Sequence, residues 1–365
     1  MAKPVILVTG GAGYIGSHIC KLLSVRGYLP VVYDNLSEGY AENVKWGPLE
    51  IGDLRDPERL REVFKQYKPI AVMHFAALAL VGESMSNPAK YYDNNLISTI
   101  TLLKTMLEFE VKSLVFSSTC ATYGVPETET LGESHPQNPI NPYGKSKLMI
   151  ETMLKDCDRA YGFKSVSLRY FNAAGADLDG EIGEKHNPET HLIPLVIQAA
   201  LGQRENITVF GTDFPTADGS AVRDYIHVRD LAEAHLKALE YLQPREDKKS
   251  LFLNLGTGTG FSVLEIIAKV KEYTGKEFTV KYADRREGDP PRLVASNGEA
   301  LKRLDFELKY SDLKTIILSA FNWHQKLLEQ NAVLRDSELR DIEKLAKAKK
   351  AAEIKEKVTV KEAGE

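Results

Sequence analysis

Val5-Ile6-Leu7-Val8-Thr9-Gly10-Gly11-Ala12-Gly13-Tyr14-Ile15-Gly16 is the stretch that decides the fold of this chain. Its four consecutive apolar residues are typical of a fully buried strand, and the glycines that follow are spaced G-x-x-G-x-x-G. Gly10 permits a tight turn, Gly13 lets backbone N–H groups approach a pyrophosphate, and Gly16 lets a helix pack closely on the strand. Apolar residues at helical spacing come next. The stretch therefore predicts a strand, a turn and a helix that together bind a dinucleotide.

An acidic residue at the end of the next apolar run supports this prediction. Pro30-Val31-Val32-Tyr33 predicts a second strand, and Asp34 follows it directly. The carboxylate of Asp34 is placed to accept a hydrogen bond from a ribose 2′-hydroxyl. No arginine or lysine follows within several residues to bind a 2′-phosphate, so the sequence favours NAD over NADP.

Strand and helix patterns alternate over the first half of the chain, which predicts an α/β fold with a doubly wound parallel sheet. Further strands are expected near residues 48–54, 70–75, 114–116 and 166–170, and long helices at 91–108 and 142–161. In such sheets, ligands bind at the carboxyl ends of the strands. We therefore expect the residues at those ends to share one crevice with the glycine turn; they are Asp34, Asp53, Phe75, Ala76, Ala77, Thr119 and Asn172.

The spacing of the predicted strands and helices suggests how the chain is divided into domains. Beyond Asn172 the predicted elements become shorter and the alternation weakens. We expect residues 1–172 to form an NAD-binding Rossmann domain, with segments near 224–248 returning to it, and residues 173–325 to form mainly a smaller α/β substrate-binding lobe. Residues 326–365 are rich in Glu, Lys, Arg and Ala, which predicts a charged C-terminal tail, either a solvated helix or a disordered extension.

The composition is that of an ordinary globular protein. The 365 residues are 43% hydrophobic and 27% charged with a net charge of −4, which gives no reason to expect nucleic-acid or membrane-surface binding. Cys20, Cys120 and Cys157 show neither metal-ligand nor disulfide spacing, so we expect no metal site. The apolar run at residues 5–8 is too short for a signal peptide and no stretch is long enough to span a membrane, so we expect a cytoplasmic protein.

A tyrosine and a lysine four residues apart are the strongest chemical signal. Tyr143 and Lys147 lie on one face at the start of the predicted helix 142–161. A phenol has a pKa of about 10. A nearby ammonium favours the phenolate, as a nicotinamide cation in the crevice would, and so makes a base for a substrate hydroxyl. Lys147 can also bind the nicotinamide ribose, and Thr119 adds a hydroxyl that can relay the substrate proton to Tyr143.

These features together resemble the extended short-chain dehydrogenase/reductase superfamily, and further segments resemble its UDP-glucose 4-epimerase family. The segments are His74–Ala77, Val81–Ser84, Tyr91–Asn95, Leu168–Asn172, Val222–Val228 and Arg285–Asp289. The resemblance runs from about residue 4 to residue 325, and the tail has no counterpart in it. It implies a Rossmann fold, NAD as cofactor, a UDP-sugar as substrate, and a homodimer formed through helices 91–108 and 143–161.

The resemblance also implies roles for individual residues. Tyr143 would be the catalytic base and acid, Lys147 its electrostatic partner and Thr119 the third catalytic residue. The residues expected at NAD are Gly10, Gly13, Tyr14, Ile15, Gly16, Asp34, Asn35, Asp53, Leu54, Phe75, Ala76, Ala77, Asn94, Lys147 and Tyr170. The residues expected at the UDP-sugar are Thr119, Tyr143, Asn172, Leu192, Phe210, Arg223, Arg286, Asp289 and Leu293. Chemistry supports the two arginines, because guanidinium groups bind a diphosphate through paired N–H donors.

The activity that the resemblance implies is NAD-dependent inversion at C4 of a UDP-hexose through a transient 4-keto intermediate, which interconverts UDP-glucose and UDP-galactose. Two alternatives stay open. One is a sugar-nucleotide 4,6-dehydratase of the same superfamily, although such enzymes typically carry Asp-Glu after the strand-end threonine and here Cys120-Ala121 follow. The other is a non-catalytic NAD-sensing scaffold.

Two positions depart from the pattern of the family. Ala79 stands where many relatives carry a lysine that contacts the cofactor, and Leu293 stands where many carry a tyrosine near the sugar. A leucine is shorter and has no hydroxyl, so it leaves a roomier and more apolar pocket. We therefore expect a side activity on UDP-N-acetylglucosamine.

Overall fold

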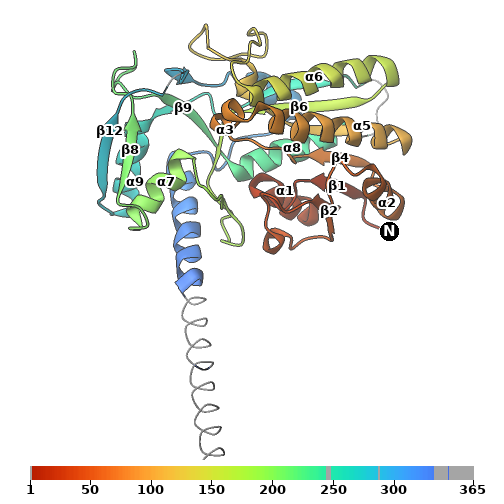
Figure 1. Ribbon diagram of the computed structural model, residues 1–365, viewed down its shortest axis with the longest axis horizontal. Coiled ribbons are helices and arrows are strands. Elements are labelled where there is room, and N and C mark those ends of the chain that lie inside the picture. Colours follow the sequence, from red (N-terminus) through yellow and green to blue (C-terminus); the bar gives the residue numbers. More distant parts are fainter. Residues whose placement is uncertain (1, 244–247, 287, 333–343, 345–365) are drawn as a thin grey trace, which may run out of the picture.

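A seven-stranded parallel sheet forms the centre of the molecule (Figure 1). The structure is a computed structural model that describes residues 2–243, 248–286, 288–332 and 344. The strands run in the order β10-β6-β5-β4-β1-β2-β3. They are β1 (Val5–Thr9), β2 (Leu29–Asp34), β3 (Leu49–Ile51), β4 (Ala71–His74), β5 (Ser113–Thr119), β6 (Lys164–Tyr170) and β10 (Leu251–Leu255). This order confirms the predicted doubly wound sheet, in which the chain starts in the middle and winds to one edge and then to the other.

Helices cover both faces of this sheet. One face carries α1 (Tyr14–Val25), α8 (Val228–Leu242) and α10 (Gly298–Leu304). The other carries α2 (Pro57–Tyr67), α5 (Ser98–Glu108) and α6 (Pro142–Tyr161), with α3 (Val81–Ser86) and α4 (Pro88–Tyr91) against α6. Successive residues of β1 build both cores, because Ile6 and Val8 pack with the first set of helices and Leu7 packs with the second. The unbroken apolar sequence of β1 reflects burial on both faces.

Local sequence signals determine where the helix that carries Tyr143 begins and ends. The side-chain oxygen of Asn141 accepts a hydrogen bond of 2.8 Å from the Gly144 N–H and so caps α6. Gly162 ends the helix in a left-handed conformation, with a φ of +65°. The expected helix at 142–161 and the observed one have the same bounds.

The predicted helix 91–108 contains a wider turn. α4 continues through a π-helical turn at Tyr92–Ile97 into α5. Within this turn, buried Asn95 accepts from the Leu78 N–H at 2.8 Å and donates to the Leu78 C=O at 3.0 Å. The neighbouring Asn94 lines a cleft. A π turn accommodates an extra residue, so it directs these two asparagines to different partners.

A smaller lobe lies beside the sheet (Figure 1). One of its sheets contains β7 (Asn172–Ala174), β9 (Val222–His227), β11 (Gly260–Ser262) and β13 (Arg292–Leu293), and the other pairs β8 (Asn206–Phe210) with β12 (Thr279–Ala283). Its apolar core is shared by α7 (Leu192–Ala200), α9 (Val263–Thr274) and a helix over residues 313–332. Short 3-10 turns at Ala41–Asn43 and Cys120–Thr122 complete the described elements.

Segments beyond residue 172 contribute to both units. Within the segments near 224–248, expected to return to the first domain, α8 packs on the large sheet, whereas β9 lies in a sheet of the lobe. β10, within the range 173–325 expected to be mainly the lobe, is an edge strand of the large sheet, where Leu251 pairs with Val166 of β6. The sequence of a short apolar strand such as β10 does not show which of two sheets the strand will join. Its position depends on how it packs with the rest of the folded chain.

The described part of the C-terminal tail continues a helix of the lobe. That helix runs from residue 313 to residue 332, and Trp323 and His324 on it are buried. Lys326 donates a hydrogen bond of 2.6 Å to the Gly180 carbonyl. Most of the tail expected at 326–365 lies outside the described residues, namely 333–343 and 345–365. Within the described part of the chain, no helix is long and apolar enough to cross a membrane.

Candidate active site

A cleft of about 1070 Å³ lies at the carboxyl ends of the parallel strands and is lined by residues of both the large sheet and the lobe. It brings together nearly all of the predicted site residues. They are Gly10, Gly13, Tyr14, Ile15, Gly16, Asp34, Asn35, Asp53, Leu54, Phe75, Ala76, Ala77, Asn94, Thr119, Tyr143, Lys147, Tyr170, Asn172, Arg223, Arg286, Asp289 and Leu293. Leu192 and Phe210 are the predicted residues that do not line it.

The glycine turn after β1 packs so closely against neighbouring backbone that it has no room for side chains. Gly10 has a φ of +73°, and a Cβ atom built on it would lie 2.5 Å from the backbone nitrogen of Ala76. A Cβ atom on Gly16 would lie 2.3 Å from the Gly10 carbonyl oxygen. α1 begins directly after Gly13, and no described side chain caps its first N–H groups. Uncapped N–H donors at a helix N-terminus bind a pyrophosphate, so the residues present fit NAD.

Two backbone groups hold the Asp34 carboxylate at the end of β2. Its Oδ2 atom accepts from the Ala12 N–H at 3.0 Å, and its Oδ1 atom accepts from the Leu36 N–H at 2.9 Å. Burial raises the pKa of this carboxyl above its usual value, although the two hydrogen bonds oppose the shift. The carboxylate lines the cleft, so its remaining lone pairs can accept from ribose hydroxyls.

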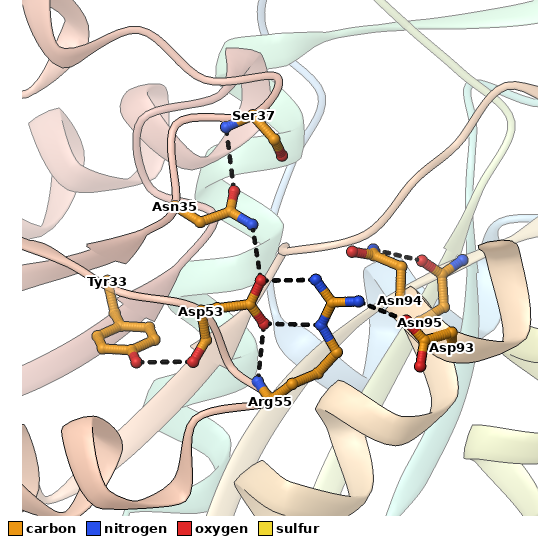
Figure 2. A network of polar contacts seen from close by, with 8 residues as sticks. All are labelled: Tyr33, Asn35, Ser37, Asp53, Arg55, Asp93, Asn94 and Asn95. Atoms are coloured by element: carbon orange, nitrogen blue, oxygen red, sulfur yellow. Dashed lines mark hydrogen bonds and ion pairs between the residues drawn. The ribbon is translucent and has the colours of Figure 1, made fainter.

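An ion-pair network holds the neighbouring residues Asn35 and Asp53 (Figure 2). Arg55 donates to Asp53 from Nε at 2.9 Å and from Nη2 at 2.8 Å, and it also pairs with Asp93. Asn35 donates to the same carboxylate at 3.2 Å. The Arg55 guanidinium holds the pKa of the Asp53 carboxyl well below its usual range. Because Arg55 is already paired with two carboxylates, it is not free to bind a 2′-phosphate, which supports NAD rather than NADP.

Tyr143, Lys147 and Thr119 meet where β5 ends against α6. Lys147 is 2% exposed, and its ammonium donates to the Ser117 carbonyl at 2.9 Å and lies 6.0 Å from the centre of the Tyr143 ring. Burial lowers the pKa of Lys147 to about 7, although the Glu151 carboxylate opposes the shift. Burial raises the pKa of Tyr143 to about 12, against the effect of a hydrogen bond with Thr119.

These shifts bear on the expected role of the lysine. The expectation is that the Lys147 ammonium favours the Tyr143 phenolate, whereas burial opposes charge on both side chains. A nicotinamide cation in the cleft would be a second source of positive charge that favours the phenolate.

We expect Tyr143 to stay protonated in the cofactor-free chain until alkali unfolds it, because its pKa is about 12. A pH titration of near-ultraviolet phenolate absorbance, taken as the difference between wild type and Tyr143→Phe, isolates this one phenol from the other tyrosines. A difference step near neutral pH would contradict the assignment and show that Lys147 alone suffices to ionise Tyr143.

Two arginines lie on the lobe side of the cleft. Arg223, on β9, forms an ion pair with Asp289 and donates to the Val222 carbonyl at 2.8 Å. Arg286 stacks on Phe210, with its guanidinium carbon 4.0 Å from the ring centre. Phe210 thus supports a cleft residue without lining the cleft itself. Two guanidinium groups at one end of a cleft provide the donors that a diphosphate requires.

The other predicted substrate residues lie near these arginines or in the lobe core. Asn172 donates its amide to the Asp224 carbonyl at 3.0 Å. Leu293 pairs with Arg223 in the sheet, lines the cleft and also packs against a buried apolar cluster. Leu192 begins α7 and packs against the core of the lobe, whereas Leu195, one helical turn later, lines the cleft.

Comparison with known proteins identifies the family. Residues 6–256 match the NAD dependent epimerase/dehydratase family. The chain belongs to this family. Membership confirms the expected resemblance, the Rossmann-type fold and the dependence on NAD.

Individual members of the epimerase/dehydratase family are similar over nearly their whole length. The UDP-glucose 4-epimerase of Rhizobium meliloti (strain 1021) is 56% identical, and the match covers 88% of this chain and 97% of that protein. The crystal structure of the Brucella ovis UDP-glucose 4-epimerase in complex with NAD is 51% identical, with a TM-score of 0.85 and coverage of 88% and 98%. The Bifidobacterium longum enzyme in complex with NAD⁺ and UDP is 36% identical, with a TM-score of 0.84 and the same coverage. The expectation of an epimerase is thereby confirmed.

A buried ion pair lies beneath the catalytic candidates of this epimerase/dehydratase family member, and the sequence analysis missed it. Glu151 follows Lys147 by one helical turn and is fully buried. It accepts from Arg169 of β6 at 2.9 Å from Nε and at 2.6 Å from Nη2, and from the Ser118 hydroxyl of β5 at 2.6 Å. The pair joins α6 to two strands. No local pattern shows which glutamate and which arginine will meet across elements.

A second cluster missed by the sequence analysis lies at the edge of the cleft. The donor atoms of Glu184, His186, Glu189 and His191 lie within 4.8 Å of one another. Burial lowers the pKa of the two histidines, but the carboxylates outweigh it and raise the pKa of His186 to about 9 and of His191 to about 10. The signal that could have shown the cluster is the close alternation of Glu and His in Glu184-Lys185-His186-Asn187-Pro188-Glu189-Thr190-His191.

Proposed function

We propose that this chain is a UDP-glucose 4-epimerase that uses NAD to invert C4 of a UDP-hexose and so interconverts UDP-glucose and UDP-galactose. The observation that carries the proposal is that Tyr143 and Thr119 share one cleft with the glycine turn and with Arg223. A proton-transfer group between a dinucleotide site and a diphosphate site suits this reaction. The relatives named UDP-glucose 4-epimerase support it.

Inversion at an unactivated carbon requires a C–H bond to break and to form again on the other face. NAD, when bound, would supply the hydride chemistry at C4. In this proposal, the Tyr143 hydroxyl group, once ionised, takes the proton from the C4 hydroxyl as the sugar is oxidised, and gives it back to O4 as the sugar is reduced. Thr119 would orient the C4 hydroxyl beside Tyr143, and Lys147 would hold the nicotinamide ribose.

The substrate must turn its sugar while its diphosphate stays bound. Arg223 and Arg286 would hold the diphosphate through charge-assisted hydrogen bonds, with Asp289 positioning Arg223. The 4-keto sugar, held only through that diphosphate, can then present its opposite face for the return of the hydride. In this proposal the diphosphate therefore stays in place while the sugar rotates.

The two alternatives have less support. A 4,6-dehydratase needs an acid and a base to eliminate water, but Cys120 and Ala121 follow Thr119 in the cleft, and burial raises the pKa of Cys120 to about 12. Neither residue exchanges protons with a sugar at neutral pH. A non-catalytic scaffold has no need for a buried Lys147 beside Tyr143.

Incubation of the purified full chain with UDP-glucose, followed by NMR of the products, tests the proposal. We expect UDP-galactose to form until both sugars reach equilibrium, with NAD in catalytic amounts. Accumulation of free NADH in step with product would indicate a dehydrogenase, a 4-keto-6-deoxy product would indicate the dehydratase, and no turnover would indicate the scaffold.

The expected side activity leads to a prediction about Leu293. We expect Leu293→Tyr to lower kcat/KM for UDP-N-acetylglucosamine by about tenfold relative to UDP-glucose, because a bulkier side chain leaves less room for the N-acetyl group. Initial rates with both sugars measure the ratio, and Leu328→Tyr on the exposed helix surface is the matched control. An unchanged ratio in Leu293→Tyr would show that this residue only packs.

We also propose that the chain is a cytoplasmic homodimer, formed through the helical run that ends in α5 and through α6. Exposed apolar side chains support this, because Ile97 before α5 is 48% exposed and Met149 on α6 is 45% exposed. Sedimentation equilibrium of the full chain tests the oligomeric state.

A further inference from the structure

We propose that Glu184, His186, Glu189 and His191 form a binding site for one divalent transition-metal ion, with Zn²⁺ as the best match. The four side chains line the cleft, and two of them, His186 and Glu189, also line a neighbouring cavity of about 140 Å³. They are outside the groups proposed to move the hydride and the proton, so this inference does not depend on the proposed function. It revises the expectation, based on cysteine spacing, that the chain binds no metal.

The separations between the donor atoms suit a tetrahedral ion. His191 Nδ1 lies 2.8 Å from Glu184 Oε1 and 3.1 Å from Glu189 Oε1. His186 Nδ1 lies 3.2 Å from Glu184 Oε1 and 3.7 Å from Glu189 Oε2. Zinc binds imidazole nitrogen and carboxylate oxygen at about 2.0–2.2 Å, which puts two tetrahedral ligands about 3.4 Å apart. These nitrogen–oxygen separations lie on both sides of that value, and one donor atom from each residue lies within 4.8 Å of the others, so small shifts of the side chains would bring them onto one ion.

Unpartnered polar atoms at the same place point independently to a ligand. The Glu189 side chain is only 4% exposed, yet its Oε2 atom has no hydrogen-bond partner among the described residues. The same holds for Nε2 of His324, which lines the small cavity with Glu189. Buried polar atoms nearly always have a partner. Two such atoms around one cavity indicate that the cluster binds something more than its own side chains.

Charge and donor type narrow the choice of ion. Once the imidazole protons have been released, the two carboxylates bring two negative charges, which one divalent cation neutralises. Mixed imidazole and carboxylate donors suit Zn²⁺ and its substitute Co²⁺, whereas Mg²⁺ and Ca²⁺ prefer sites made of oxygen alone. The nearby acidic cluster of Asp177, Asp179 and Glu181 has no imidazole and already surrounds the Lys21 ammonium at 2.7–2.8 Å, so it serves as a matched control.

An ion at this site would connect three parts of the molecule. His191 directly precedes α7, and the His186 ring stands edge-on to Tyr14 of α1, with ring centres 6.4 Å apart. The hydroxyl of Tyr14 in turn donates to the Gly175 carbonyl at 2.6 Å. The bound metal would therefore brace the rim of the cleft, and we expect it to raise the melting temperature of the chain.

Titration of the full chain, prepared without a histidine tag and stripped by a chelator, with Co²⁺ tests the site. We expect visible absorption bands of tetrahedral Co²⁺ that saturate at one equivalent and disappear when Zn²⁺ is added. Loss of an outer-sphere partner costs about 10–100-fold in metal affinity, so loss of a ligand in His186→Ala or Glu189→Gln should cost at least about 100-fold. Asp179→Asn should bind as wild type does.

Two results would overturn the proposal. One is that neither absorption nor calorimetry detects stoichiometric binding to the wild-type chain, which would leave the four side chains as a proton-bridged ion cluster only. The other is that His186→Ala and Asp179→Asn bind equally well. Circular dichroism verifies the fold of each variant. If a first variant does not fold, His191→Ala replaces it, because the His191 side chain is 50% exposed and its loss disturbs the core less. The wild-type titration decides the matter even if a variant does not fold.

Discussion

Tyr143→Phe is expected to lower kcat by about 10²–10⁴-fold, because it removes the group that takes and returns the proton of the C4 hydroxyl. Phenylalanine keeps the ring that lies 6.0 Å from the Lys147 ammonium and loses only the hydroxyl. The space in the cleft and the diphosphate anchor at Arg223 stay as they are. The loss should therefore fall on kcat, with little change in the affinity for NAD or UDP-glucose.

Steady-state kinetics with UDP-galactose as substrate, together with calorimetric titration of UDP, separate these two effects. Tyr241→Phe is the control, because it removes the same atom from a hydroxyl that donates to the Lys249 carbonyl. We expect it to keep the wild-type rate. A Tyr143→Phe variant with the wild-type kcat would show that another group moves the proton.

Glu151→Gln is expected to lower the free energy of unfolding by about 3–5 kcal/mol, because it leaves the Arg169 guanidinium buried without its counter-charge. The two side chains are 0% and 3% exposed, so water cannot replace the lost partner. Glutamine can still bond Ser118, so the loss reports the missing charge more than a missing hydrogen bond.

Urea unfolding of wild type and variant measures this change. Glu272→Gln is the matched control, since it removes a carboxylate that pairs with Lys269 at 2.7 Å on an exposed face, where a salt bridge contributes about 0–1 kcal/mol. Equal changes in the two variants would contradict the idea that the buried pair anchors α6 to the sheet.

Features set by nearby residues could be predicted from the sequence. The glycine turn, the position of Asp34 at the end of β2, and the bounds of α6 depend on spacing and on capping residues, and the structure shows each of them. The position of Tyr143 opposite Thr119 follows from the same local logic, since one begins a helix and the other ends a strand of the same sheet.

Features that depend on residues far apart in the sequence could not be predicted from it. Arg55 contacts Asp93, and Glu151 contacts Arg169, only because the fold brings separate elements together. The pKa of Tyr143 could not be predicted either, because spacing shows that a lysine is near but not that both groups are deeply buried. Burial is a property of the whole molecule, and here it opposes the effect expected from the neighbour.

The late position of β10 in the sequence affects the protein while it is being synthesised. The strand is complete only after residue 255 has been synthesised, yet it covers the outer edge of β6, whose last residue is Tyr170. α8, which covers one face of β5 and β6, also arrives late. A nascent chain that ends near residue 172 therefore presents an unpaired strand edge and an uncovered apolar face, which are templates for pairing with other chains. The first half of this protein depends on the second half for protection during synthesis, and for the same reason it is not a module that can be transferred by itself into another protein.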